Sequence, residues 1–244
     1  MRVFDAHRLL GQLPNTPAGV TADGLLAELD HLDIDACAAT STAELFGDPA
    51  DPAARQAAGT VAGPRTLAVP VIVPAVAGAG WPATVDDVLA ASPALVRACP
   101  VRHRFDPLGP VAVRWWPRLA EHGIPVAIDA AECGLPVVAA LAAVHPGLRI
   151  LVLSPGYREL RRLGELLETF PGVHVETGTV VTAGGVEWLA GRYGAHRLVF
   201  GTGAPRWDDA GARFLLEHLD LPAADVAMIA AGSARALIGT RWPW

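Results

Sequence analysis

Eight short apolar runs alternate with amphipathic segments along the 244 residues of this chain. The runs are continuously apolar, which is typical of parallel strands that are covered on both faces. We place these strands at residues 3–9, 35–40, 66–73, 94–99, 125–129, 148–153, 173–176 and 197–200. This regular alternation predicts an α/β fold, a single (β/α)₈ barrel that spans residues 1–244 and carries an extra C-terminal helix.

The segments between the strands have helical apolar spacing. We predict helices at residues 21–32, 49–58, 86–91, 111–122, 136–145, 158–170, 186–193, 208–219 and 223–237, and a loop at 11–20. Pro70 predicts a bulge in the third strand, because proline cannot donate to a strand ladder. A doubly wound open sheet is the alternative fold. It would need a glycine-rich phosphate turn after the first strand, where this chain has Asp5-Ala6-His7.

Composition excludes several classes of function. The net charge of −6 argues against nucleic acid or an anionic membrane as a partner. No run of about 18 uncharged apolar residues is present, and the chain starts without an apolar leader, so we expect a cytoplasmic protein without a membrane span. Three widely spaced cysteines, Cys37, Cys99 and Cys133, form neither a disulfide framework nor a zinc ribbon pattern.

All 19 basic residues are arginine, and the chain has no lysine. Schiff-base catalysis on a lysine is therefore excluded, as is a carboxylated lysine that bridges two metal ions.

The first strand runs directly into polar residues. Since residues i and i+2 of a strand point the same way, we expect Asp5, His7 and Leu9 to share one face. In a (β/α)₈ barrel the carboxyl ends of the strands surround the active site, so this face would open on the mouth of the barrel.

Polar residues follow the other predicted strands too, and they predict a polar mouth. Besides Asp5 and His7, these residues are Ser41, Thr42, Arg102, His103, Asp129, Glu132, Cys133, Ser154, Tyr157, Arg158, Glu176, Thr177, Thr202, Arg206 and Asp208. We expect His7 to act as general base together with Asp5, Asp129 or Glu176, because an imidazole titrates near neutral pH.

We expect a second group of residues near the strand ends to bind the substrate. Arg102 or Arg206 would hold an anionic group, because a guanidinium fork matches a carboxylate. His103, Tyr157 and Ser154 complete the predicted substrate-binding set. Structural roles stay open for some of these residues: Asp5 as a local backbone cap, and Arg102 with His103 as a solvated loop.

Three motifs resemble the amidohydrolase superfamily, specifically the amidohydrolase-related barrels that include metal-dependent decarboxylases. They are D-A-H at 5–7, L-V-F-G-T-G-A-P at 198–205 and A-G-S-A-R-A-L at 231–237, and the layout of residues 145–177 is also similar. The resemblance covers essentially the full chain and implies the same barrel fold. It also implies a hydrolase or lyase activity at the mouth.

The sequence departs from that family's pattern at the implied metal ligands. The family's Asp-x-His-x-His motif has Leu9 in its last position here, and the histidine after strand five is matched by Asp129. The histidine after strand six corresponds to Ser154, and the aspartate of Gly-Ser-Asp-x-Pro corresponds to Gly203. A zinc site normally needs three protein ligands, so we expect no metal cofactor. A zinc ion held by His7, Asp129 and Glu176 stays open as the alternative.

Two functions follow from this pattern. The first is a hydrolase or lyase that acts on a small carboxylate or amide substrate without the usual metal hydroxide. The second is a catalytically silent barrel that pairs with a metal-bearing paralogue. We expect either a homodimer or a heteromer with such a paralogous barrel.

Overall fold

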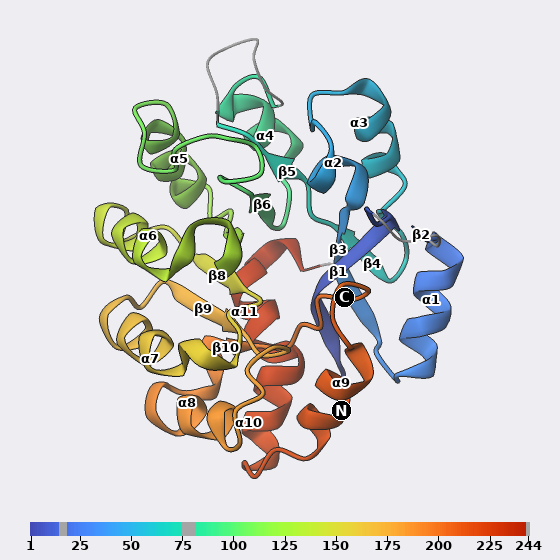
Figure 1. The fold of residues 1–244 in the computed structure, drawn as a ribbon, viewed down its shortest axis with the longest axis vertical. Coiled ribbons are helices and arrows are strands. Elements are labelled where there is room, and N and C mark those ends of the chain that lie inside the picture. The colour runs from blue at the N-terminus through green and yellow to red at the C-terminus, as the bar shows by residue number, and fades with distance from the viewer. Residues whose placement is uncertain (15–18, 75–81, 243–244) are drawn as a thin grey trace.

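The computed structural model describes residues 1–14, 19–74 and 82–242, and shows strands in a ring surrounded by helices (Figure 1). The strands are β1 (Phe4–Gln12), β3 (Ala36–Ser41), β4 (Thr66–Ala68), β5 (Val71–Ile72), β6 (Val96–Ala98), β7 (Val126–Asp129), β8 (Ile150–Leu153), β9 (Val173–Glu176) and β10 (Leu198–Val199). Neighbouring strands pair in parallel from β1 to β4 and from β5 to β10. A short strand, β2 (Gly19–Val20), pairs antiparallel with the end of β1 inside the predicted loop, of which residues 15–18 lie outside the described ranges.

Backbone hydrogen bonds close the ring at two places. Between β4 and β5 the chain continues the barrel wall, because Val69 N donates to Ala39 O at 2.9 Å and Arg97 N donates to Pro70 O at 2.9 Å. Between the last strand and β1, Ala6 N donates to Phe200 O at 3.0 Å and Leu9 N donates to Ala204 O at 2.9 Å. The predicted (β/α)₈ barrel is therefore confirmed, and the predicted third strand is divided in two at Pro70.

Most helices surround the ring of strands, and α11 lies at its middle, where its apolar residues join the inner core (Figure 1). The helices follow the strands in chain order. They are α1 (Ala22–His31), α2 (Thr42–Phe46), α3 (Pro52–Gly59), α4 (Val85–Ala91), α5 (Trp115–Glu121), α6 (Ala130–Val144), α7 (Leu160–Thr169), α8 (Gly185–Tyr193), α9 (Asp209–Glu217), α10 (Ala223–Ala227) and α11 (Ser233–Ile238). The sequence reading missed α2, and α6 is two helical segments joined at a non-helical Gly134. Because Pro136 lies two residues after this break, it falls in the first turn of the second segment, where its missing N–H leaves no helical bond unmade. None of the described helices is long and apolar enough to cross a membrane.

Two apolar layers form the core. The outer layer lies between the strands and the helices, and includes Cys37 and Ala39 of β3 with Leu25 and Leu29 of α1. The inner layer fills the barrel itself, and α11 contributes three residues to it: Ala234, Leu237 and Ile238. The C-terminal helix thus closes the amino-terminal end of the barrel and leaves the opposite end for the polar residues.

A bulge in β1 changes which residues share a face. Asp5 pairs with Cys37, but Arg8 pairs with Ala39, so β1 holds one extra residue between them. Cys37 and Ala39 both belong to the outer layer, and Asp5 and Arg8 point outward with them. The expectation that Asp5 and His7 share a face is therefore wrong. The extra residue lets the side chain of His7 point into the barrel, while the side chain of Asp5 stays on the outer face of β1.

Candidate active site

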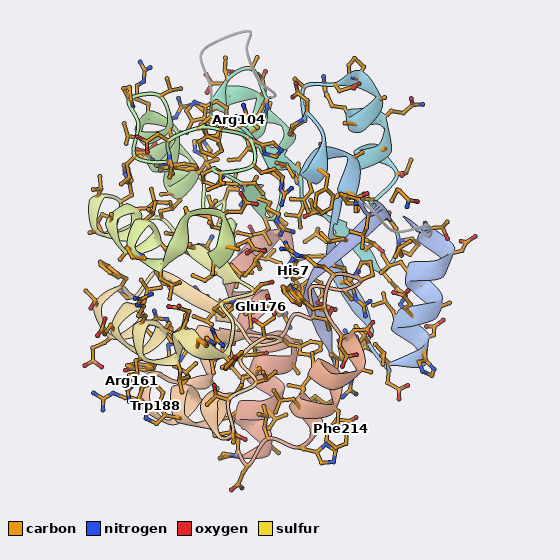
Figure 2. All side chains as sticks on the ribbon, in the orientation of Figure 1. His7, Arg104, Arg161, Glu176, Trp188 and Phe214 are labelled. Carbon is orange, nitrogen blue, oxygen red and sulfur yellow. The ribbon has the colours of Figure 1, made fainter. Side chains whose placement is uncertain are left out.

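Four polar side chains meet inside the carboxyl-terminal end of the barrel. They come from four strands: His7 from β1, Arg97 from β6, Asp129 from β7 and Glu176 from β9. Each is at most 4% exposed. His7 and Glu176 lie together near the centre of the ring, as Figure 2 shows. We call these four residues the central quartet.

Glu176 is held by three N–H groups. Its Oε2 accepts a hydrogen bond from Ser154 N at 2.7 Å and lies 3.1 Å from His7 Nδ1, and its Oε1 accepts one from Gly178 N at 2.9 Å. Burial raises the pKa of Glu176, while the backbone N–H groups of Ser154 and Gly178 work in the opposite direction. Gly178 permits this close approach, because a Cβ there would lie 2.7 Å from Oε1 and 2.1 Å from Gly201 O.

The surroundings of His7 fix which ring nitrogen carries its proton. Arg97 Nη1 lies 3.2 Å from Nε2, and a guanidinium can only donate hydrogen bonds, so Nε2 is the acceptor. Nδ1 therefore bears the proton and donates to Glu176. Burial, followed by the nearby charge of Arg97, lowers the pKa of His7 to about 3. The imidazole is neutral in this arrangement.

Asp129 connects the quartet to the rim of the barrel. Its Oδ1 accepts from Ala131 N at 2.9 Å and so caps α6, while its Oδ2 lies 3.6 Å from Arg97 Nη2 and 3.9 Å from Arg206 Nη1. The side chain of Arg206 is 40% exposed, so two arginines approach the same carboxylate, one from inside the barrel and one from solvent.

The rim beside Arg206 is aromatic. The guanidinium of Arg206 lies 5.4 Å from the ring centre of Trp207, and Trp207 Nε1 donates to Ser154 Oγ at 3.1 Å. Tyr157 is exposed on the same side of the fold, after β8, and its ring lies beneath Arg158. Ser154 therefore touches both the rim, through its hydroxyl, and the quartet, through its backbone N–H.

Asp5 lies outside this constellation. Its carboxylate accepts from His7 N, from Thr202 N and Oγ1, and from Arg8 Nε, at 2.7 to 3.0 Å. Arg8 in turn reaches Glu28 on α1 and Asp209 on α9. Asp5 thus ties β1 to the segment after β10, and it touches His7 only through the backbone.

Arg102 and His103 form a separate group near α2 and α6. Arg102 Nε lies 3.3 Å from Glu132 Oε1, and its guanidinium lies 4.7 Å from the ring centre of Phe46. His103 is half-buried, and burial lowers its pKa. Among the described residues, no hydrogen bond or ion pair joins Arg102 or His103 to the central quartet.

Sequence reasoning missed Arg97. It lies in the apolar run 94–99, which the sequence predicts as a strand and for which no site role is predicted. A signal was present, because an arginine within a strand covered on both faces must find a partner for its charge. Its Nε has no hydrogen-bond partner among the described residues.

The residues at the implied metal position do not fit a metal ion. Within the described ranges, no three His, Cys, Asp or Glu side chains gather as a set of ligands. Leu9 packs against Leu45 and Cys99, and Gly203 offers no ligand. The place beside His7 Nε2 is taken by Arg97.

Comparisons with known proteins agree with this architecture. Residues 28–240 match the model of a family described as Amidohydrolase. A search of curated proteins found no match.

Solved structures share the fold at low sequence identity. A TIM-barrel protein from Bordetella bronchiseptica is 12% identical with a TM-score of 0.75, over 98% of both chains. The 5-carboxyvanillate decarboxylase of Sphingomonas paucimobilis is 14% identical with a TM-score of 0.76, over 97% of this chain and 98% of that one. A putative 2-pyrone-4,6-dicarboxylic acid hydrolase from Pseudomonas putida is 20% identical with a TM-score of 0.70, over 98% of this chain and 97% of that one.

Proposed function

The chain belongs to the amidohydrolase family, and on that premise we propose that it is a hydrolase or lyase acting on a small carboxylate-bearing substrate at the carboxyl-terminal mouth of the barrel. One observation carries the proposal. The Glu176–His7 pair lies beside Arg97, and both Arg97 and Arg206 approach the carboxylate of Asp129. Two solved structures that share the fold are named for activities on carboxylic acids, which supports the same substrate class.

Arg206 and Arg97 would bind the carboxylate of the substrate one after the other. Arg206 is partly exposed and meets the anion first, and Arg97 receives it inside the barrel. Arg97 Nε has no acceptor among the described residues, so a bound carboxylate supplies one. Guanidinium groups suit this task because their planar fork makes two parallel hydrogen bonds to a carboxylate.

His7 would then act as the general base. A substrate carboxylate that accepts from Arg97 draws Nη1 away from His7, which frees the lone pair on Nε2 to take a proton. Glu176 keeps the Nδ1–H oriented and stabilises the imidazolium that forms. Neutralisation of Arg97 by the substrate also removes one of the causes that lower the pKa of His7.

The test is a melting-temperature screen of the chelator-treated protein with small mono- and dicarboxylates and their amides. A ligand at a hundred times its Kd should stabilise the protein by about 2.7 kcal/mol. We expect carboxylates to raise Tm more than amides, and Arg206→Ala to weaken their binding at least about tenfold, since charge-assisted hydrogen bonds contribute roughly 1.5–3 kcal/mol.

Arg192→Ala is the matched control. This residue pairs with Glu168 on the outer helices, so its loss should leave the screen unchanged. Turnover of a hit should survive chelation and disappear in His7→Gln. A screen without any carboxylate hit, or hits that bind Arg206→Ala as tightly as the wild type, would overturn the proposal.

The silent-barrel alternative is favoured by a different observation. The quartet side chains are buried and pair with one another, and both ring nitrogens of His7 are already engaged. On this alternative the chain alone is inert, and it raises the kcat/KM of a metal-bearing paralogous barrel when the two are mixed. Arg206→Ala should then leave that stimulation intact.

A further inference from the structure

The contacts of Arg97 define a place for a positive charge inside the carboxyl-terminal end of the barrel. This place lies between an imidazole nitrogen, His7 Nε2, and a carboxylate oxygen, Asp129 Oδ2. Such atoms are good ligands for a divalent metal, because both can donate a lone pair. Here a guanidinium lies against both of them, at 3.2 Å and 3.6 Å.

We propose that the guanidinium of Arg97 is the resident cation of this barrel, and that it excludes a divalent metal from the place between His7 and Asp129. The guanidinium occupies this place before any substrate arrives, whether or not the protein has the proposed activity.

Hydrogen-bond chemistry is the first reason. A metal ion would need the Nε2 lone pair of His7, which here accepts from Arg97 Nη1. The other ring nitrogen points to Glu176, whose carboxylate is already held by two backbone N–H groups. The lone pairs of His7 and Glu176 are therefore already used by protein donors.

Charge is the second reason. The quartet contains the carboxyls of Asp129 and Glu176, and Arg97 and Arg206 are the guanidinium groups next to Asp129. A divalent ion placed there would face the permanent charge of Arg97 at short range in a buried site. Arginine cannot relieve that repulsion by losing its proton.

Placement on β6 is the third reason. Arg97 lies in the middle of β6, which pairs with β5 on one side and β7 on the other. Its side chain is buried inside the barrel and comes from a strand, not from a loop at the rim. The guanidinium is thus fixed by the same strand pairing that closes the barrel.

The experiment measures metal binding directly. Chelator-treated wild type and Arg97→Ala are titrated with Zn²⁺ by calorimetry, and Co²⁺ absorption serves as a second readout. We expect no stoichiometric binding by the wild type, and affinity at least about tenfold higher in Arg97→Ala, because His7 Nε2 and Asp129 are uncovered. The gain should vanish in His7→Ala/Arg97→Ala.

Arg206→Ala is the matched control, since it removes an equal charge near Asp129 without uncovering His7; it should bind zinc no better than the wild type. Methylguanidinium should raise the Tm of Arg97→Ala, but not that of the wild type, by refilling the vacated place. If Arg97→Ala does not fold, Arg97→Gln is measured instead. One zinc ion per wild-type chain lost on His7→Ala, or no gain of affinity on removal of Arg97, would contradict the inference.

Discussion

Glu44 shows how strongly burial acts on a single carboxyl group in this barrel. It lies on α2 with 1% of its surface exposed, and its Oε2 accepts a hydrogen bond from Val71 N at 3.2 Å. Burial raises its pKa from 4.5 to about 7, although the bond from Val71 and the charge of Arg55 oppose the shift. The folded protein therefore favours the protonated form.

The difference between the pKa of Glu44 in the folded and in the unfolded protein predicts a pH-dependent effect of Glu44→Gln on stability. The folded pKa is higher than the unfolded one, so the stability that protonation supplies is complete below about pH 4.5 and is lost as the pH rises to about 7. Relative to wild type, Glu44→Gln should gain on the order of 3 kcal/mol across that window and then level off. Urea unfolding of both proteins at several pH values measures this difference, and a difference independent of pH would contradict it.

Arg97 and Asp5 show which residues of the site could not be placed correctly from the sequence. His7, Asp129 and Glu176 lie in strands, Ser154 and Arg206 follow strands, and a closed barrel brings the carboxyl ends of its strands together. Asp5 lies in the same strand as His7, yet its partner Thr202 is 197 residues away. The register shift between Asp5 and Arg8 separates Asp5 from His7, and no local pattern in the sequence indicates it.

At the scale of elements, β1 and the segment after β10 are joined through Asp5 and Arg8. Both side chains are fully enclosed, at 0% and 1% exposure, and Asp5 accepts four hydrogen bonds there. Removal of one partner from a buried ion pair leaves an uncompensated charge, which costs about 3–5 kcal/mol.

We therefore expect Asp5→Ala to lower the free energy of unfolding by about 3–5 kcal/mol. Asp5→Ala/Arg8→Met should lose less than the sum of the two single variants, because neither charge is then left alone. Denaturant unfolding of the four proteins gives the coupling. Additive losses would show that the two side chains do not depend on each other.

Element boundaries could be predicted where the pattern is local. The predicted strand 173–176 coincides with β9, and the predicted helix 186–193 differs from α8 by one residue. The strand 66–73 was read as one element because its apolar run is continuous across Pro70. In the fold, the residues before Pro70 pair with β3 and those after it pair with β6.

At the scale of the whole molecule, the two ends of the barrel hold different kinds of residues. Apolar residues of α11 fill the amino-terminal end of the barrel, while the quartet occupies the other end. Leu237 is 2% exposed and belongs to the inner layer, so Leu237→Ala should cost about 2–5 kcal/mol of stability. Binding of a carboxylate hit should stay within about twofold of wild type, since mutations at separated sites act independently.

Arg206→Ala should show the opposite behaviour, with weaker binding and a nearly unchanged Tm. The two variants, compared by thermal unfolding and ligand titration, test whether stability and binding are located at opposite ends. A large loss of binding in Leu237→Ala would show that the two ends are coupled through the barrel wall.

A buried arginine at the centre of a barrel also affects how the protein comes to be ready for use. Its guanidinium is synthesised with the polypeptide, so the charge arrives at its destination when β6 takes its place between β5 and β7. On the proposal that Arg97 excludes a metal ion, the protein acquires that charge without a supply of zinc, and growth without zinc is expected to leave its fold and ligand binding unchanged.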